Sequence, residues 1–140
     1  MVQVKTSKKF EVSADVVWDL IAGFDSLQNY HPAVESSVLE KAGAVRRLTL
    51  KEDGGCVVER LVSFDDVART FAYKIIDLVD CGLPFKNYLS KVRVEELGAN
   101  TCEVHWSSEF DAVDTDDETA AEAARGIYAG CYEGIESKVL

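Results

Sequence analysis

One long helix, predicted over Thr115 to Leu140, is the feature that most limits what this chain can fold into. Its inward side is nearly free of bulk, because Gly126, Gly130 and Gly134 recur every fourth residue. A glycine inside a helix costs about 1 kcal/mol relative to alanine, so three in register need a reason. Either they allow close backbone packing against a sheet, or they leave room for a ligand. A second stripe of small and branched residues runs beside them: Ala120, Ala123, Ala124, Ile127, Cys131 and Ile135.

Apolar and polar residues alternate with a period of two in most of the chain before this helix, which is typical of strands. A first strand is expected over Val2 to Val12, then a helix capped by Ser13, then a short second helix over Ser26 to Tyr30 that ends at His31-Pro32. Six further strands are predicted, over 34–40, 45–51, 56–64, 70–78, 86–96 and 102–112. This order predicts an α+β fold in which one antiparallel sheet of seven strands is covered by the C-terminal helix.

Size and charge narrow the class of protein. A chain of 140 residues with 47% hydrophobic composition is expected to form a single domain over residues 1–140. The net charge of -10 argues against a nucleic-acid partner, which would require clustered Lys and Arg. No apolar run is long enough for a membrane span, and the first residues lack the apolar middle of a signal peptide, so the cytoplasm is the default location. The oligomeric state is expected to be a monomer or a weak dimer.

The cysteines and histidines indicate no metal or cofactor. Without a C-x-x-C pair or an export signal, the cysteines are expected to be reduced thiols. With only two histidines in addition, no zinc-ligand spacing is present, and neither a structural metal nor a cofactor is expected. The cysteines are Cys56, Cys81, Cys102 and Cys131, and the histidines are His31 and His105.

Two strands place a charge on the face that is expected to point inward. Arg46 shares a face with Leu48, and Glu59 and Arg60 are neighbours, so a regular strand must send one of those two charges toward the core. An inward Glu59 near Arg46 would form a buried ion pair, because a lone buried charge is too costly. Alternatively, a bulge or a strand end lets both charges reach water. The aromatic residues expected to point inward around this patch are Phe71, Tyr73, Tyr88, Trp106 and Phe110.

Five segments carry a resemblance to a known family. They are VSADVVWDLIAGFDSLQNYHPAV (12–34), RRLTLKEDGGCVVERL (46–61), LPFKNY (83–88), VHWSSEF (104–110) and IYAGCYEGI (127–135). In order and spacing they resemble the polyketide cyclase/dehydrase-like branch of the START/Bet v 1 (SRPBCC) superfamily. The resemblance implies a helix-grip fold, in which the sheet wraps around the C-terminal helix with two short helices at one end. Pro84 corresponds to a loop that borders the cavity mouth in related proteins.

The resemblance and the inward faces together give a set of expected ligand-binding residues. The main hypothesis is a protein that binds a small hydrophobic or aromatic molecule, lipid- or polyketide-like, in a cavity between the sheet and the C-terminal helix. The residues expected to contact it are Trp18, Phe24, Tyr30, Glu59, Phe71, Tyr73, Phe85, Tyr88, Trp106, Ile127, Gly130 and Cys131.

Two other functions stay open. One is a cyclase or dehydratase in which Glu59 acts as a base, Tyr88 or Tyr73 donates a hydrogen bond and Arg46 stabilises an oxyanion, with His31 as a further catalytic candidate. The other is an interaction module in which the loop over 79–85 closes on a ligand and offers a surface to a partner. A shared fold does not decide among these three.

Overall fold

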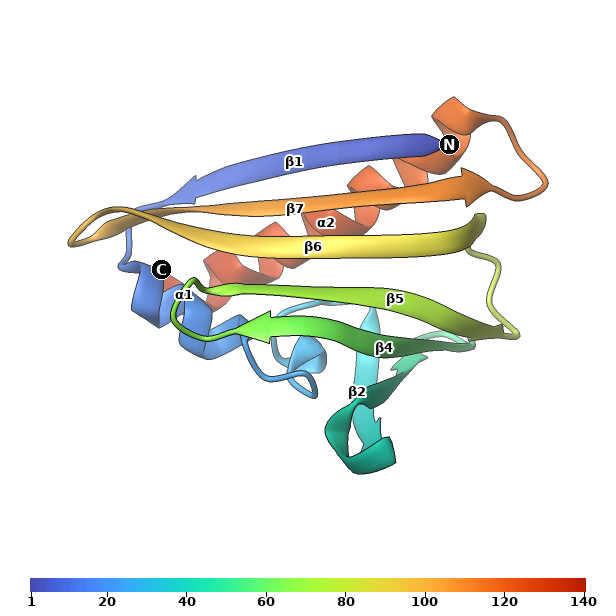
Figure 1. Cartoon of the computed structure of the whole chain (residues 1–140), viewed down its shortest axis with the longest axis horizontal. Helices are drawn as coiled ribbons and strands as arrows, with labels where there is room; N and C mark the ends of the chain where they lie inside the picture. The colour runs from blue at the N-terminus through green and yellow to red at the C-terminus, as the bar shows by residue number, and fades with distance from the viewer.

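Seven antiparallel strands and one long helix make up the structure, a computed structural model that describes residues 1–140 (Figure 1). The strands lie in the order β1-β7-β6-β5-β4-β3-β2. Every sheet neighbour is also a neighbour in the chain, except that β1 pairs with β7, so β1 and β2 form the two edges. The predicted fold class is confirmed. The strands are β1 (Val2–Phe10), β2 (Val34–Glu40), β3 (Val45–Leu50), β4 (Cys56–Asp65), β5 (Thr70–Val79), β6 (Phe85–Gly98) and β7 (Thr101–Ala112).

The helices are α1 (Ala14–Ile21), the 3₁₀ turns η1 (Leu27–Asn29) and η2 (Lys41–Gly43), and α2 (Asp117–Val139). Ser13 caps α1 as predicted, its hydroxyl accepting a hydrogen bond from the Val16 amide, and Asp116 caps α2 in the same way. The second predicted helix is only the single turn η1. None of the helices combines the length and the hydropathy that crossing a membrane requires.

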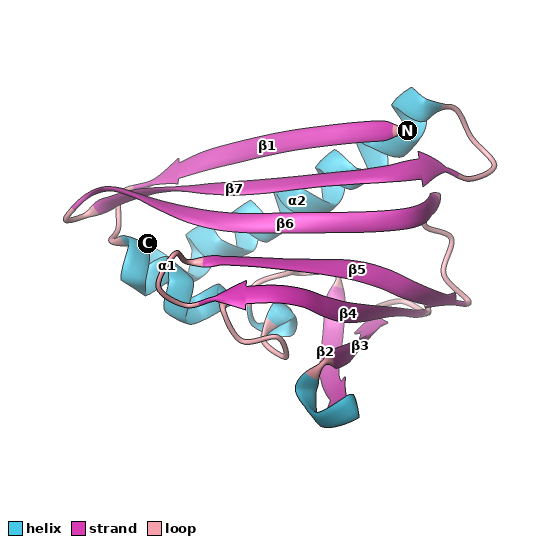
Figure 2. Ribbon diagram, viewed as in Figure 1, coloured by secondary structure: helices cyan, strands magenta, loops and turns pink.

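The core lies between one face of the sheet and α2, which runs behind the strands in Figure 2. The predicted inward faces of β6 and β7 are confirmed, since Tyr88, Trp106 and Phe110 are each at most 4% exposed. At one end of the sheet α1 covers the core with Val17, Trp18 and Ile21, which share one face of the helix and are also buried.

The sheet is not continuously hydrogen-bonded. Strand β5 pairs with β6 only where Thr70–Lys74 lies opposite Leu89–Arg93, and past that point the two strands diverge (Figure 1). The remainder of β5 stays paired with β4, while the start of β6 pairs with β7. A groove of about 780 Å³ follows the divergence on the outside of the sheet, and Ile75 and Tyr88 line it. We refer to this break in the pairing as the β5–β6 gap.

The glycines of α2 do not form the expected stripe. Gly126 is exposed, with open space where a side chain would be, whereas a β-carbon at Gly134 would overlap the carbonyl group of Tyr30. Between them, a β-carbon at Gly130 would lie 2.7 Å from Nε2 of His31. A spacing of four drifts by about 40° per step around a helix with 3.6 residues per turn, so Gly126 and Gly134 face different surroundings. The close approach is therefore to the segment before β2 and not to the sheet.

Candidate functional site

An apolar pocket of about 180 Å³ lies under the sheet, bordered by β3, β4, β5 and the middle of α2. We call it the interior pocket. Seven of the residues expected to bind a ligand line it: Glu59, Tyr73, Phe85, Tyr88, Trp106, Ile127 and Cys131. The other two catalytic candidates, His31 and Arg46, line it as well. Eight lining residues were not among the expected ligand contacts, although Ile75 was expected to face inward: Leu27, Ala33, Val34, Leu48, Leu50, Val57, Ile75 and Leu83.

Five residues expected to contact a ligand lie outside the interior pocket. Trp18 and Phe71 pack together, with ring centroids 6.0 Å apart, and the indole of Trp18 donates a hydrogen bond to Asp66. These side chains fill the end of the core under α1. The other three, Phe24, Tyr30 and Gly130, stand behind residues that line the pocket: Arg46, Trp106 and His31, respectively.

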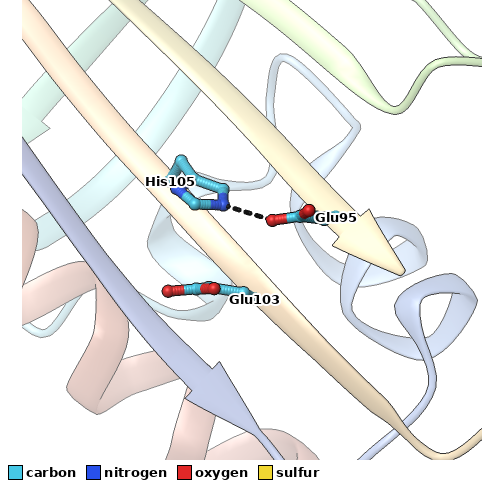
Figure 3. Close-up of side chains that lie close together, drawn as sticks. All are labelled: Glu95, Glu103 and His105. Carbon is cyan, nitrogen blue, oxygen red and sulfur yellow. Dashed lines mark hydrogen bonds and ion pairs between the residues drawn. The ribbon is translucent and has the colours of Figure 1, made fainter. Parts of the chain in front are cut away.

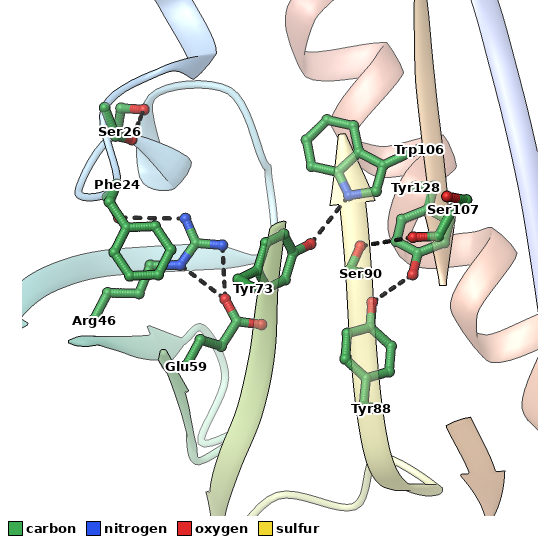
Figure 4. A network of polar contacts seen from close by, with 11 residues as sticks. Phe24, Ser26, Arg46, Glu59, Tyr73, Tyr88, Ser90, Trp106, Ser107 and Tyr128 are labelled. Carbon is green, nitrogen blue, oxygen red and sulfur yellow. Dashed lines mark hydrogen bonds and ion pairs between the residues drawn. The ribbon is translucent and has the colours of Figure 1, made fainter. Parts of the chain in front are cut away.

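Arg46 and Glu59 form the buried ion pair that the strand patterns allowed (Figure 4). They are directly opposite each other on β3 and β4, and their side chains are 2% and 7% exposed. Oε1 of Glu59 accepts a hydrogen bond from Nε of Arg46 at 2.8 Å and lies 2.6 Å from Nη2 in the ion pair. Nη1 of Arg46 donates to the carbonyl oxygen of Phe24 at 3.3 Å. The alternative that both charges reach water is wrong.

Aromatic rings surround the Arg46–Glu59 pair, and the charge of each partner affects the pKa of the other. The guanidinium carbon lies 4.3 Å from the ring centroid of Phe24 and 4.9 Å from that of Tyr73, so two aromatic faces enclose the cation. Burial raises the pKa of Glu59 above its ordinary value, and the charge of Arg46 limits that rise. Burial is the largest single influence on the Arg46 pKa and lowers it, but the neighbouring groups, Glu59 first among them, together outweigh burial and raise the Arg46 pKa.

Two further polar contacts face the pocket from the other side (Figure 4). The indole Nε1 of Trp106 donates to the hydroxyl of Tyr73 at 3.0 Å. The hydroxyls of Tyr88 and Tyr128 share a short hydrogen bond. Burial raises the pKa of Tyr73 and Tyr88 well above the ordinary value for tyrosine, so both hydroxyls keep their protons.

His31 is held by both of its ring nitrogens. Nε2 lies 3.0 Å from the carbonyl oxygen of Ile127, and Nδ1 accepts a hydrogen bond from the amide of Ala33 at 3.1 Å. This fixes the neutral tautomer with the proton on Nε2, because a carbonyl oxygen only accepts. Burial lowers the His31 pKa and favours the same neutral form. His31 therefore connects the segment before β2 to α2, and neither ring nitrogen is free to transfer a proton.

A second group of titratable side chains lies on the outer face of the sheet, where Glu95, Glu103 and His105 come within 4.8 Å of one another (Figure 3). Nε2 of His105 is 2.9 Å from Oε1 of Glu95, and the guanidinium of Arg93 approaches the same oxygen at 3.7 Å. The hydrogen bond from His105 lowers the pKa of Glu95. Because Arg93 and His105 already supply the partners of Glu95, we interpret this group as surface ion pairing.

Six of the eight unpredicted lining residues fall into two groups. Leu48, Leu50 and Val57 extend into the pocket from β3 and β4, beside Arg46 and Glu59, and strand alternation alone could have identified them. Leu27, Ala33 and Leu83 lie in irregular or single-turn segments, where no period exists to show which way a side chain points.

A sheet curved around one helix, with an apolar pocket and a buried Arg–Glu pair between them, defines a helix-grip protein. The whole chain matches one family model: residues 1–139 match "Polyketide cyclase / dehydrase and lipid transport". The protein belongs to this family.

Solved structures share this fold. XoxI from Bacillus cereus is 36% identical, with a TM-score of 0.92 over 99% of this chain and 95% of that one. An uncharacterized protein from Bacillus thuringiensis is also 36% identical, with a TM-score of 0.91 over 98% of both chains. The Zhui aromatase/cyclase from Streptomyces sp. R1128 shares the fold at 15% identity, with a TM-score of 0.78 over 97% of this chain and 92% of its own. Comparison with curated proteins gave no match.

Proposed function

We propose that this protein binds a small hydrophobic or aromatic molecule in the interior pocket. The observation that carries the proposal is the composition of the pocket wall, in which 14 of 17 residues are hydrophobic and the charges of Arg46 and Glu59 compensate each other. Specific small-molecule sites have this character, with apolar walls and a few placed polar groups. The cost of an empty apolar void also favours a ligand, because filling the void would stabilise the core.

The size of the pocket limits the ligand. Its volume of about 180 Å³ is on the scale of an engineered apolar cavity of about 150 Å³ that binds benzene. The proposed ligand therefore has one or two rings or a short alkyl chain, and is smaller than a multi-ring polyketide or a diacyl lipid. The family description, which combines cyclases, dehydrases and lipid transport, supports an apolar ligand without deciding its identity.

Binding of neutral apolar probes to the purified protein tests the proposal. Toluene and indole are titrated into ¹⁵N-labelled protein, and shifts of backbone amide signals are expected for residues around the pocket, including Ile127 and Cys131. Saturable shifts confined to this region support the proposal, whereas no shifts, or shifts spread over the outer surface, contradict it.

A pair of variants on β4 controls for unspecific binding. Val57→Phe adds bulk inside the pocket and is expected to remain folded while losing the probes, because the ring has a void to enter. Val62→Phe makes the same change on the same strand at a residue that is 53% exposed and outside the pocket, and is expected to bind like the wild type. Equal binding by both variants would place the site elsewhere.

Catalysis by the ion pair is the second candidate function. The observation that favours it is the second carboxylate oxygen of Glu59, Oε2, which has no hydrogen-bond partner in the protein and could accept a proton from a bound molecule. Mass spectrometry of the bound molecules after incubation separates the two functions. A binding protein returns them unchanged, and a cyclase or dehydratase returns a product that has lost water.

A further inference from the structure

The polar atoms of the interior pocket can be matched one by one with their partners. Both nitrogens of His31 are bonded, the indole N–H of Trp106 is used on Tyr73, and the Tyr88 hydroxyl is paired with Tyr128. Buried polar groups in proteins are almost always paired, so a group left over after this matching indicates what is missing. The groups without a partner include one acceptor on Glu59 and one donor on Tyr73, and Arg46 keeps N–H groups beyond those that contact Glu59 and Phe24.

The acceptor is Oε2 of Glu59. Both contacts of Arg46 with Glu59, a hydrogen bond and an ion pair, are to Oε1, so the other oxygen of the same carboxylate has no donor in the protein although the side chain is only 7% exposed. Oε2 retains some accessible surface, and a carboxylate oxygen on a mostly buried side chain gains from a hydrogen-bond donor.

The donor is the hydroxyl proton of Tyr73. An indole N–H can only donate, so in the contact with Trp106 the Tyr73 oxygen is the acceptor. The proton of that hydroxyl then has no acceptor in the protein, and Tyr73 is 4% exposed. Tyr73 and Glu59 both line the interior pocket and project from the neighbouring strands β5 and β4 (Figure 4).

We infer that the ligand of the interior pocket is a neutral ring compound that donates a hydrogen bond to Oε2 of Glu59 and accepts one from the hydroxyl of Tyr73. This inference rests on the proposed function and adds the polar chemistry of the ligand to it. A ring that carries a hydroxyl or amino group together with a carbonyl group has the required pair of functions. A purely apolar molecule would enter the pocket but leave both protein groups unpaired.

The same groups discriminate against anions. The single cation of the pocket, Arg46, is already neutralised by Glu59 and lies against the rings of Phe24 and Tyr73. A ligand carboxylate would meet the unpaired oxygen of Glu59 as a like charge in a buried site, where repulsion is poorly screened. Free fatty acids and aromatic carboxylates are therefore expected to bind worse than their neutral analogues.

The test changes the ligand and leaves the protein intact, so that folding is not at issue. Four probes of similar shape are compared by calorimetry or NMR at about pH 6, well below the pKa of a phenol: 4-hydroxyacetophenone, acetophenone without the donor, 4-ethylphenol without the acceptor, and the anion 4-hydroxybenzoate. Each hydrogen bond to a buried group corresponds to about tenfold in affinity. 4-Hydroxyacetophenone is therefore expected to bind about tenfold tighter than acetophenone and 4-ethylphenol, and the anion weakest of all.

Two tyrosine variants locate the donor. Tyr73→Phe removes the hydroxyl that is assigned to the ligand, and is expected to abolish the preference for 4-hydroxyacetophenone over 4-ethylphenol while keeping its preference over acetophenone. Tyr132→Phe is the matched control, since the hydroxyl of Tyr132 lies 2.7 Å from that of Thr6 and accepts from the Trp106 amide, outside the pocket. This control is expected to keep both preferences.

The outcomes separate this inference from the proposed function. If all three neutral probes bind with equal affinity, the polar inference is wrong and binding of an apolar ligand stands. Tightest binding of 4-hydroxybenzoate overturns the assignment of a neutral ligand, and an unchanged preference in Tyr73→Phe overturns the assignment of the donor. If toluene, indole and the four probes all fail to bind, both the proposed function and this inference are wrong.

Discussion

Gly134 lies directly against the backbone of Tyr30, so closely that a β-carbon would overlap the Tyr30 carbonyl oxygen. The contact joins α2 to the segment before β2, and that segment supplies His31 and Ala33 to the interior pocket. The absence of a side chain at Gly134 therefore sets the distance between α2 and the segment before β2, and both contribute residues to the wall of the interior pocket.

We expect alanine to have opposite effects at two glycines of α2. Gly134→Ala must push the Tyr30 backbone away and is expected to lower the free energy of unfolding by roughly 2–3 kcal/mol. Gly126→Ala has open space and is expected to raise it by about 0.5–1 kcal/mol, because alanine favours the helix. Urea denaturation measures both changes. A loss at both positions would mean that the glycines have a shared role after all.

The lowered pKa of His31 predicts a stability that depends on pH. The unfolded chain binds a proton at this residue near pH 6.5, whereas the folded protein resists it because the ring is buried. The unfolded state then holds more protons between the two pKa values, so His31 contributes stability that is present above the unfolded pKa and is lost as pH falls through the lower, folded one. The free energy of unfolding is compared at several pH values between about 5 and 7 in the wild type and in His31→Asn. A steeper fall on acidification is expected in the wild type, and parallel curves would exclude His31 as the cause.

The Arg46–Glu59 pair is expected to be much more sensitive to loss of one partner than to loss of both. Arg46→Met or Glu59→Leu alone leaves a buried charge unpaired and is expected to cost about 3–5 kcal/mol in unfolding free energy. The double variant replaces the pair by apolar side chains and is expected to recover most of that loss. Thermal and urea unfolding of the wild type, the two single variants and the double variant give the four free energies of a double-mutant cycle. Additive losses would show that the two side chains act independently.

The four free thiols are expected to fall into two classes. Cys102 and Cys131 are buried, and burial raises the pKa of both, so the reactive thiolate form is disfavoured. Cys56 and Cys81 are only partly buried. Labelling with a thiol reagent, followed by mass spectrometry, is expected to modify these two first and the buried pair only on unfolding. Rapid modification of Cys131 in the folded protein would contradict this order.

The sequence predicted which way a side chain faces better than it predicted where along the sheet that side chain lies. Alternation identified Trp106 and Tyr88 as inward, and the cost of an unpaired buried charge identified Arg46 and Glu59 as one possible pair. The same alternation could not tell that Trp18 and Phe71 belong to the end of the core that α1 fills, because a period of two has no information about distance along the sheet. The contact between Gly134 and Tyr30 joins residues far apart in the chain, and no local pattern reports such a contact.

The β5–β6 gap has a mechanical consequence. Strands β1, β7 and β6 form one hydrogen-bonded block and β5 to β2 another, and the two are joined only where Thr70–Lys74 meets Leu89–Arg93. Ile75 and Tyr88, which flank the open part of the gap, also line the interior pocket. The sheet is therefore stiff within each block and compliant between them, because backbone that lacks ladder hydrogen bonds opens at the least cost. We therefore expect a change in pocket volume to be taken up first between the two blocks, where the pairing is shortest.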